Sequence, residues 1–379
     1  MSVPVVDPGL WPDDVAAATL ACLPDMGPAR LRRVFERWPD PAGALAAVRR
    51  GDGARVFADG DRPASEQQRA ALARRWAAAA RDLVLEPVLR RRATRVFLAD
   101  TPEYPIRDED LPDLPPVLLG EGDAPEVVDR PRVAIVGTRS ASVHGLEDAH
   151  DLGAHLARAG ITVVSGLAIG IDAAAHDGAI GAGGGAVGVV ATGLDVVYPR
   201  RHIALFDRVR RAGLLLTESG FGVAAERWRF PVRNRIIAAL ADVVVVIEAT
   251  LKGGARITAD RALEYDRPVL VMPGSRRNPA AAGCNALLAD GAQPLLDPDD
   301  VLLALGLTAG SRRGWGAPAA RPTPTGDAAC VLRACGGEPA SVDQLASRTG
   351  LGLDAVARAL RDLERQRWIE SKRGWWWPR

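Results

Sequence analysis

The chain has 379 residues, of which 47% are apolar and 25% charged, a composition typical of a soluble globular protein with two or three domains. Its 48 basic and 47 acidic residues leave a net charge of +1, which excludes a polycation. Any nucleic-acid site must therefore be a local patch. Only Lys252 and Lys372 are lysines, and neither stands in a Gly-Lys-Ser/Thr sequence, so we expect no P-loop ATPase.

The cysteines indicate neither a metal site nor a disulfide framework. Cys22, Cys284, Cys330 and Cys335 form no Cys-x-x-Cys pair and no cluster with zinc spacing. We also find no secretory signal and no apolar stretch near the ~18 residues that a membrane span requires. We therefore expect a cytoplasmic protein with reduced thiols, no metal and no membrane contact.

Residues 1–100 are rich in alanine and arginine and predict a small helical domain. Within it, the segment Leu23-Pro24-Asp25-Met26-Gly27-Pro28 resembles the turn of a helix-hairpin-helix motif. Glycine permits the tight bend, and the following helix start could meet a phosphate. A purely structural turn is the favoured interpretation.

The next domain, 101–307, alternates short apolar runs with helical patterns. Such runs are typical of strands buried on both faces, and their alternation with helices predicts a doubly wound parallel sheet. Ligands of these sheets bind at the carboxyl ends of the strands. The predicted strands are 133–136, 161–164, 186–190, 214–216, 243–247 and 269–272, and the predicted helices are 144–159, 172–182, 201–211, 233–241 and 255–265.

The C-terminal part divides into a linker and a compact tail. Residues 308–325 are rich in glycine, proline and threonine, which is typical of a linker. In the tail, 326–379, three helices are predicted over 328–335, 341–349 and 353–367, with Ser341 and Asp354 as caps of the second and third. A hairpin around residues 371–373 follows, and the whole pattern predicts a winged helix.

Two loops at strand ends carry glycine and small polar residues. The first, Gly137-Thr138-Arg139, precedes a helix start whose free N–H groups favour phosphate, and Arg139 adds a guanidinium. An ordinary strand-to-helix turn remains the alternative. The second runs from Ser165-Gly166 to Asp172, with His176 four residues on. Capping and packing are favoured there over an acid–base pair.

The segment 227–235 is the most informative. It holds four arginines and two aromatic residues, Trp228 and Phe230. Aromatic faces can stack on unpaired bases while arginines hold phosphates. A solvated basic loop with buried rings is an equally supported interpretation. The loop containing Arg276 also follows a predicted strand end, whereas Tyr198-Pro199 is interpreted as structural packing.

These blocks, in this order, resemble the DNA-processing protein A family (DprA, also called Smf). The specific matches are Phe-Pro-x-Arg-Asn-Arg from Phe230 and Ser-Gly-x-Ala-x-Gly-Ile-Asp-x-x-Ala-His from Ser165. The resemblance covers nearly the full chain. It implies a Rossmann-like domain between a small helical domain, of the sterile alpha motif or helix-hairpin-helix type, and a winged helix. It also implies a cofactor-free homodimer that binds single-stranded DNA and helps to load RecA during natural transformation, with no enzymatic activity.

The resemblance assigns roles to individual residues. Arg139 matches a phosphate-holding arginine, and Arg227 and Phe230 match a basic residue and a base-stacking ring. The full set of expected DNA-binding residues is Gly137, Thr138, Arg139, Ser165, Gly166, Arg227, Phe230, Arg233, Asn234, Arg235, Arg256 and Arg276. One departure is Gly253-Gly254-Ala255-Arg256, where the family usually has Ser-Gly-Ser-Leu.

Two alternatives compete with a single-strand binder. Related Rossmann-like enzymes cleave nucleoside monophosphates with a Pro-Gly-Gly-x-Gly-Thr-x-x-Glu loop, but Pro273-Gly274-Ser275-Arg276-Arg277 breaks that pattern. The tail could instead read duplex DNA, yet residues 321–379 hold 10 basic and 7 acidic residues, a difference of only +3. A protein-binding role for the tail is at least as well supported.

Overall fold

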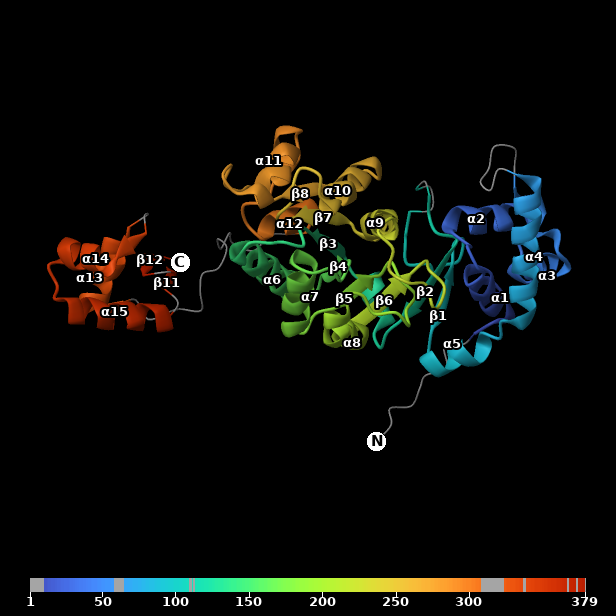
Figure 1. The fold of residues 1–379 in the computed structure, drawn as a ribbon, viewed down its shortest axis with the longest axis horizontal. Coiled ribbons are helices and arrows are strands. Elements are labelled where there is room, and N and C mark those ends of the chain that lie inside the picture. Colours follow the sequence, from blue (N-terminus) through green and yellow to red (C-terminus); the bar gives the residue numbers. More distant parts are fainter. Residues whose placement is uncertain are drawn as a thin grey trace. The chain divides into compact units, whose positions relative to one another are not determined.

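The computed structural model describes residues 10–57, 65–108, 111, 113–307, 324–336, 339–366, 368–372 and 374–378. The chain forms two compact units, Met1–Trp315 and Gly316–Arg379 (Figure 1). Residues 308–323, most of the predicted linker, lie outside the described residues. No helix in the described part of the chain is both long and apolar enough to cross a membrane.

The first unit is built on a sheet whose described strands follow the order β1-β2-β6-β5-β4-β3-β7-β8-β9. Strands β3 to β9 pair in parallel, and β2 and β1 extend the β6 edge in antiparallel pairing. The predicted doubly wound α/β fold is confirmed, and its six predicted strands are β3 to β8. The strands are β1 Arg95–Leu98, β2 Val117–Glu121, β3 Arg132–Val136, β4 Thr162–Ser165, β5 Ala186–Val189, β6 Gly213–Thr217, β7 Val243–Val246, β8 Val269–Val271 and β9 Gln293–Pro294.

The order in which strands are added to the sheet reverses at β3. From this strand the chain runs outward through β4, β5 and β6, then returns to add β7, β8 and β9 on the other side. The loops that leave β3 and β7 therefore diverge to opposite sides. Such a switch point opens a crevice at the carboxyl ends of the strands.

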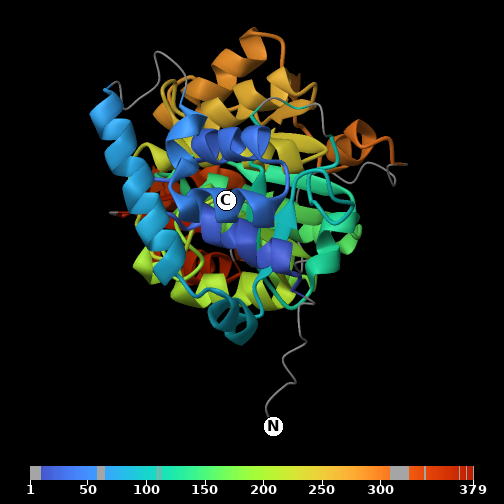
Figure 2. The same cartoon turned by 90° about the vertical axis from the view of Figure 1, so that its right-hand side faces the viewer.

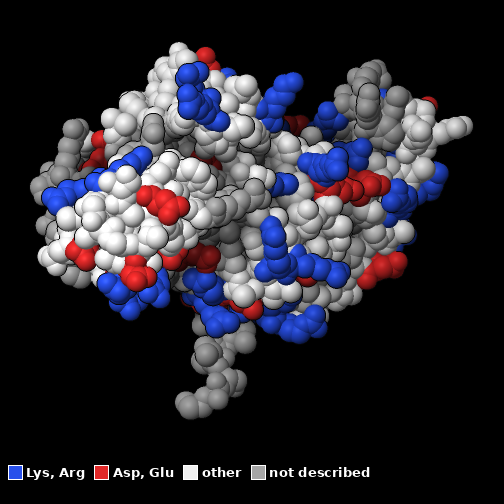
Figure 3. Space-filling view, turned by 60° about the vertical axis from the view of Figure 1, so that its left-hand side comes forward, with Lys and Arg blue, Asp and Glu red and all other residues white. Residues whose placement is uncertain are grey.

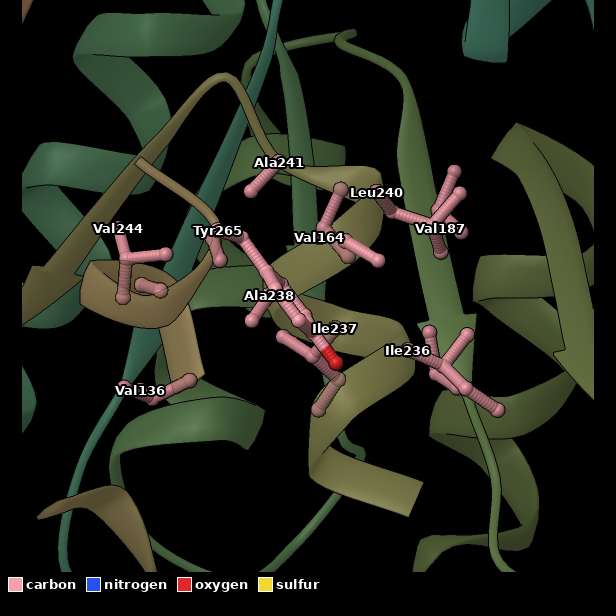
Figure 4. Close-up of a cluster of buried hydrophobic side chains, with 14 of the residues drawn as sticks. Val136, Val164, Val187, Ile236, Ile237, Ala238, Leu240, Ala241, Val244 and Tyr265 are labelled. Atoms are coloured by element: carbon pink, nitrogen blue, oxygen red, sulfur yellow. The ribbon is translucent and has the colours of Figure 1, made fainter. Parts of the chain in front are cut away.

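Helices cover both faces of this sheet (Figure 1). One face packs against α9, α10 and α11, and the other against α6, α7 and α12. Figure 4 shows Ile236, Ile237 and Leu240 of α9 lying against strand residues Val164 and Val187. These helices are α6 Val143–Arg158, α7 Ile171–Gly181, α8 Ile203–Ala212, α9 Arg229–Leu240, α10 Gly254–Glu264, α11 Ala282–Ala289 and α12 Asp299–Ala304.

The N-terminal helices pack on the remaining part of the sheet (Figure 2). Fully buried Trp76 donates from Nε1 to the carbonyl oxygen of Pro24 at 2.8 Å, which fixes the turn at Gly27. The predicted helical character holds except at β1, which pairs with β2. The helices are α1 Pro12–Ala21, α2 Pro28–Arg37, α3 Pro41–Arg50, α4 Glu66–Asp82 and α5 Glu86–Arg92, and the 3-10 turns of the first unit are η1 Asp52–Val56, η2 Pro125–Asp129, η3 Arg200–His202 and η4 Pro279–Ala281.

The second unit is a winged helix, as predicted. Ser341 accepts from the backbone of Gln344 at 3.3 Å, while Gln344 accepts from Ser341 N at 2.9 Å. This reciprocal capping box confirms Ser341 as a cap. Asp354 is not one, because the third helix begins after Gly352 without a side-chain cap. The elements are α13 Gly326–Cys335, β10 Ala340–Ser341, α14 Val342–Thr349, α15 Leu353–Arg365, β11 Ile369–Lys372 and β12 Trp375–Pro378.

Candidate functional site

A cavity of about 630 Å³ opens at the switch point of the sheet. Its walls come from the loop after β3, the loop after β7 and the starts of α9 and α10. Seven of the predicted site residues line it, namely Gly137, Thr138, Arg139, Arg227, Phe230, Arg233 and Asn234. Segments almost 100 residues apart in the chain thus meet at one place.

Hydrogen bonds to Glu248 hold the loop after β3 in place. Glu248, which follows β7, accepts from Thr138 N through its carbonyl oxygen at 2.7 Å and from Ser142 N and Oγ through its carboxylate at 2.8 and 2.7 Å. A Cβ on Gly137 would lie 2.4 Å from Cγ1 of Ile171 and 2.9 Å from the Glu248 carbonyl oxygen. Only glycine fits there, so the loop presents the exposed Arg139 from a rigid base.

Phe230 lies between two other side chains of the cavity. The guanidinium carbon of Arg139 is 4.9 Å from the centroid of the Phe230 ring, a cation–π distance. The Tyr198 ring is tilted by 46° with its centroid 5.5 Å from that of Phe230. Tyr198, interpreted from sequence as structural packing, is 46% exposed and lines the cavity. It is therefore a candidate functional residue that sequence reasoning missed.

Two buried groups of opposite charge, Arg233 and Asp172, support the cavity. Arg233, 4% exposed, donates from Nη1 to the carbonyl oxygens of Gly166, at 2.9 Å, and Val189. Burial lowers the pKa of Arg233 to about 10, so it stays charged at neutral pH. Burial raises the pKa of Asp172, and the charge of Arg233 opposes that shift. Both groups flank Gly166, where a Cβ would come within 2.5 and 2.8 Å of them.

Asp172 does not cap α7, contrary to the favoured interpretation. Its carboxylate accepts from Gly166 N at 3.1 Å and Ala168 N at 3.3 Å, and so shapes the loop after β4 instead. His176 is fully buried, and burial lowers the pKa of this imidazole to about 4. A neutral, buried ring is core packing, as favoured from sequence.

Asn234 joins α9 to the start of α10. Its Nδ2 donates to the carbonyl oxygen of Gly254 at 3.1 Å. Gly253, Gly254 and Ala255 line the cavity, so the backbone of this helix start faces it. The departure at Gly253–Arg256 removes side-chain hydroxyls, but the helix start itself remains at the site.

Some predicted residues lie elsewhere. Ser165 is fully buried and donates to the carbonyl oxygen of Ile135 at 2.7 Å, so it supports the loop rather than a ligand. Arg235 is buried, pairs with Glu218 at 2.5 Å and lies on a different side of α9, outside this cavity. Arg256 pairs with Asp290 at 2.9 Å, and Arg276 is exposed in the loop after β8; neither lines the cavity.

The cavity has a local excess of positive charge. It is lined by Arg139, Arg227, Arg233 and one carboxylate, Asp172. Within the described residues, neither Arg139 nor Arg227 forms an ion pair with a carboxylate. On the face seen in Figure 3, basic and acidic side chains are interspersed. No three His, Cys, Asp or Glu residues of the described chain are grouped to hold a metal ion.

Comparison with known proteins gives matches along most of the chain. The model of the family described as DNA recombination-mediator protein A matches residues 95–306, and that of the DprA winged helix domain matches 316–374. Protein Smf of Synechocystis is 42% identical over 210 residues, which are 55% of this chain and 53% of that protein. The chain thus spans about half the length of this relative.

Two solved structures share the fold. DNA processing protein A (DprA) from Streptococcus pneumoniae superposes with a TM-score of 0.62 at 28% identity, covering 78% of this chain and 98% of the other. DNA processing protein A from Helicobacter pylori, solved in a study of its single-stranded DNA binding mode, gives 0.50 at 29% identity, covering 56% and 95%.

Proposed function

Because this chain belongs to the DNA recombination-mediator protein A family, as its motifs predict, we propose that it binds single-stranded DNA without strong sequence preference. The observation that carries the proposal is one cavity that joins an aromatic ring to two arginines with no carboxylate partner among the described residues. Arg139 and Arg227 supply charge, and Phe230 supplies a flat face. The H. pylori relative, whose structure was solved to study its single-stranded DNA binding mode, supports the same assignment.

Each group of the cavity has a distinct task in this proposal. The two guanidiniums contact phosphates, and the start of α10 adds backbone N–H groups and a positive helix end. A base stacks on Phe230. Stacking and phosphate contacts do not read the hydrogen-bonding edges of bases, so binding tolerates many sequences.

Arg139 links base stacking to phosphate binding. In the free protein its guanidinium covers Phe230 at 4.9 Å. A base that stacks on the ring from this side displaces Arg139, whose charge then becomes available to a phosphate of the same strand. Tyr198 flanks the ring, with its own centroid 5.5 Å away.

The wider role follows from the family. We propose that the chain acts as a cytoplasmic homodimer that protects incoming single strands during natural transformation and loads RecA onto them, without breaking bonds in DNA. Release of free base from a nucleotide by the purified protein would contradict the non-enzymatic role. Failure to promote RecA assembly on coated strands would contradict the mediator role while leaving DNA binding intact.

The ring of Phe230 gives the sharpest test of DNA binding. We expect Phe230→Ala and Phe230→Leu to weaken binding of a labelled oligothymidine by about fivefold to a hundredfold, the worth of one stacked base. Phe230→Trp keeps a flat ring and should bind within a few-fold of wild type. Fluorescence anisotropy measures all four proteins, and equal affinities for them would contradict the assignment.

A further inference from the structure

A second cavity, of about 730 Å³, lies on the other side of the α9 start. The Gly27 turn forms one wall and the first turn of α9 the other. Pro231 lines both this cavity and the one at the switch point. The two cavities are therefore neighbours within the first unit, separated by one helical turn.

Trp228 lines the second cavity with an exposed indole. The residue is 52% exposed, and the guanidinium carbon of Arg229 lies 4.4 Å from its ring centroid. Two residues further on, Phe230 is covered by Arg139 at 4.9 Å. The same arrangement, a ring with a guanidinium on one face, thus occurs twice in succession, once in each cavity.

The charges of the second cavity differ from those of the first. Five arginines and three carboxylates line it. Arg229 pairs with Glu226 at 3.0 Å, Arg32 with Asp113 at 3.1 Å, and Arg261 with nearby Glu264 at 2.5 Å. Since these cations already have partners, any affinity of this cavity for a strand comes mainly from the ring.

We propose that Trp228 is a second base-stacking position. A single strand held at Phe230 passes over the first turn of α9 and places a further base on the indole, beside the Gly27 turn. This inference rests on the proposed function, because it extends the strand bound there. Continuity with the first cavity and the repeated ring–guanidinium pair favour DNA over a protein as the occupant.

The test compares variants of the full chain on two strand lengths. Oligothymidines of about 4 and about 12 nucleotides are titrated against wild type, Trp228→Ala, Trp228→Phe and Phe230→Ala. Trp11→Ala is the matched control, since Trp11 is an exposed tryptophan, at 74%, that lines neither cavity. Thermal unfolding verifies that each variant is folded.

We expect Trp228→Ala to weaken binding of the long strand by about fivefold to a hundredfold and to leave the short strand within about twofold. Its salt dependence should equal that of wild type, because no phosphate contact is removed. Trp228→Phe should retain most of the affinity, and Trp11→Ala all of it.

The other outcomes separate the inference from the function on which it rests. If Phe230→Ala weakens binding but Trp228→Ala matches wild type at both lengths, Trp228 is not a base-stacking position. The exposed indole is then better explained as a contact for another protein. Equal losses on both lengths would mean that Trp228 only supports the α9 start. If Phe230→Ala also binds normally, the proposed function itself fails.

Discussion

Replacing Arg139 by alanine tests how the cavity holds phosphate. The side chain is exposed, lines the cavity and has no carboxylate partner among the described residues, so its charge is available to a strand. Each phosphate contact on single-stranded DNA contributes about 0.7 to the slope of log affinity against log salt. Arg139 and Arg227 together should therefore supply a slope of about 1.4, and Arg139→Ala should remove about half of it.

The expected change of slope is large enough to measure. Between about 50 and 200 mM salt, a difference of 0.7 in slope means that the affinity of wild type falls about 2.5-fold more than the affinity of Arg139→Ala. Anisotropy titrations of an oligothymidine at four or five salt concentrations resolve such a difference. Arg256→Ala is the control, because Arg256 is paired with Asp290 at 2.9 Å outside the cavity. An unchanged slope in Arg139→Ala, or an equal loss in Arg256→Ala, would refute the reasoning.

Two further predictions concern the support of the site. Gly137→Ala should destabilise the fold by about 1–3 kcal/mol in urea unfolding, because its Cβ would clash with Ile171 and with backbone. Gly181→Ala has open space at the end of α7 and should be neutral or slightly stabilising; equal effects of the two would contradict the packing argument. Burial lowers the folded-state pKa of His176 to about 4, below its unfolded value near 6.5, so the unfolded state binds the proton first and stability falls as pH drops from 6.5 to 4. Wild type should lose up to ~3 kcal/mol more than His176→Leu across that window, and parallel pH profiles would contradict this.

The sequence predicts the sheet well because its strands are buried on both faces. Uninterrupted apolar runs such as residues 243–247 indicate a buried strand from the local sequence alone. The ends of β3 to β8 are therefore predicted to within one or two residues. The antiparallel strands β1 and β2 are different. They join the sheet through β2, which pairs in antiparallel fashion with β6, almost 100 residues away. No local pattern encodes that pairing.

The geometry of α9 explains why Arg235 lies apart from the cavity at the switch point. Pro231 suggests a loop, and the predicted helix begins at residue 233, but proline is tolerated in the first turn because its missing N–H would have no acceptor there. The helix in fact begins at Arg229. With 3.6 residues per turn, Phe230, Arg233 and Asn234 then share one face, while Arg235 turns away toward Glu218.

The position of Tyr198 in the cavity could not be predicted from helix periodicity. It follows β5, and nothing in its own segment distinguishes a cavity wall from core packing. Only the three-dimensional neighbourhood of Phe230, reached from α9, reveals its position at 5.5 Å.

The most direct measurement is a crystal structure of the full chain with a short oligothymidine. A thymine stacked on Phe230, with a phosphate within hydrogen-bonding distance of the Arg139 guanidinium, is the predicted result. A strand bound on another surface, with Phe230 still covered by Arg139, would contradict the account.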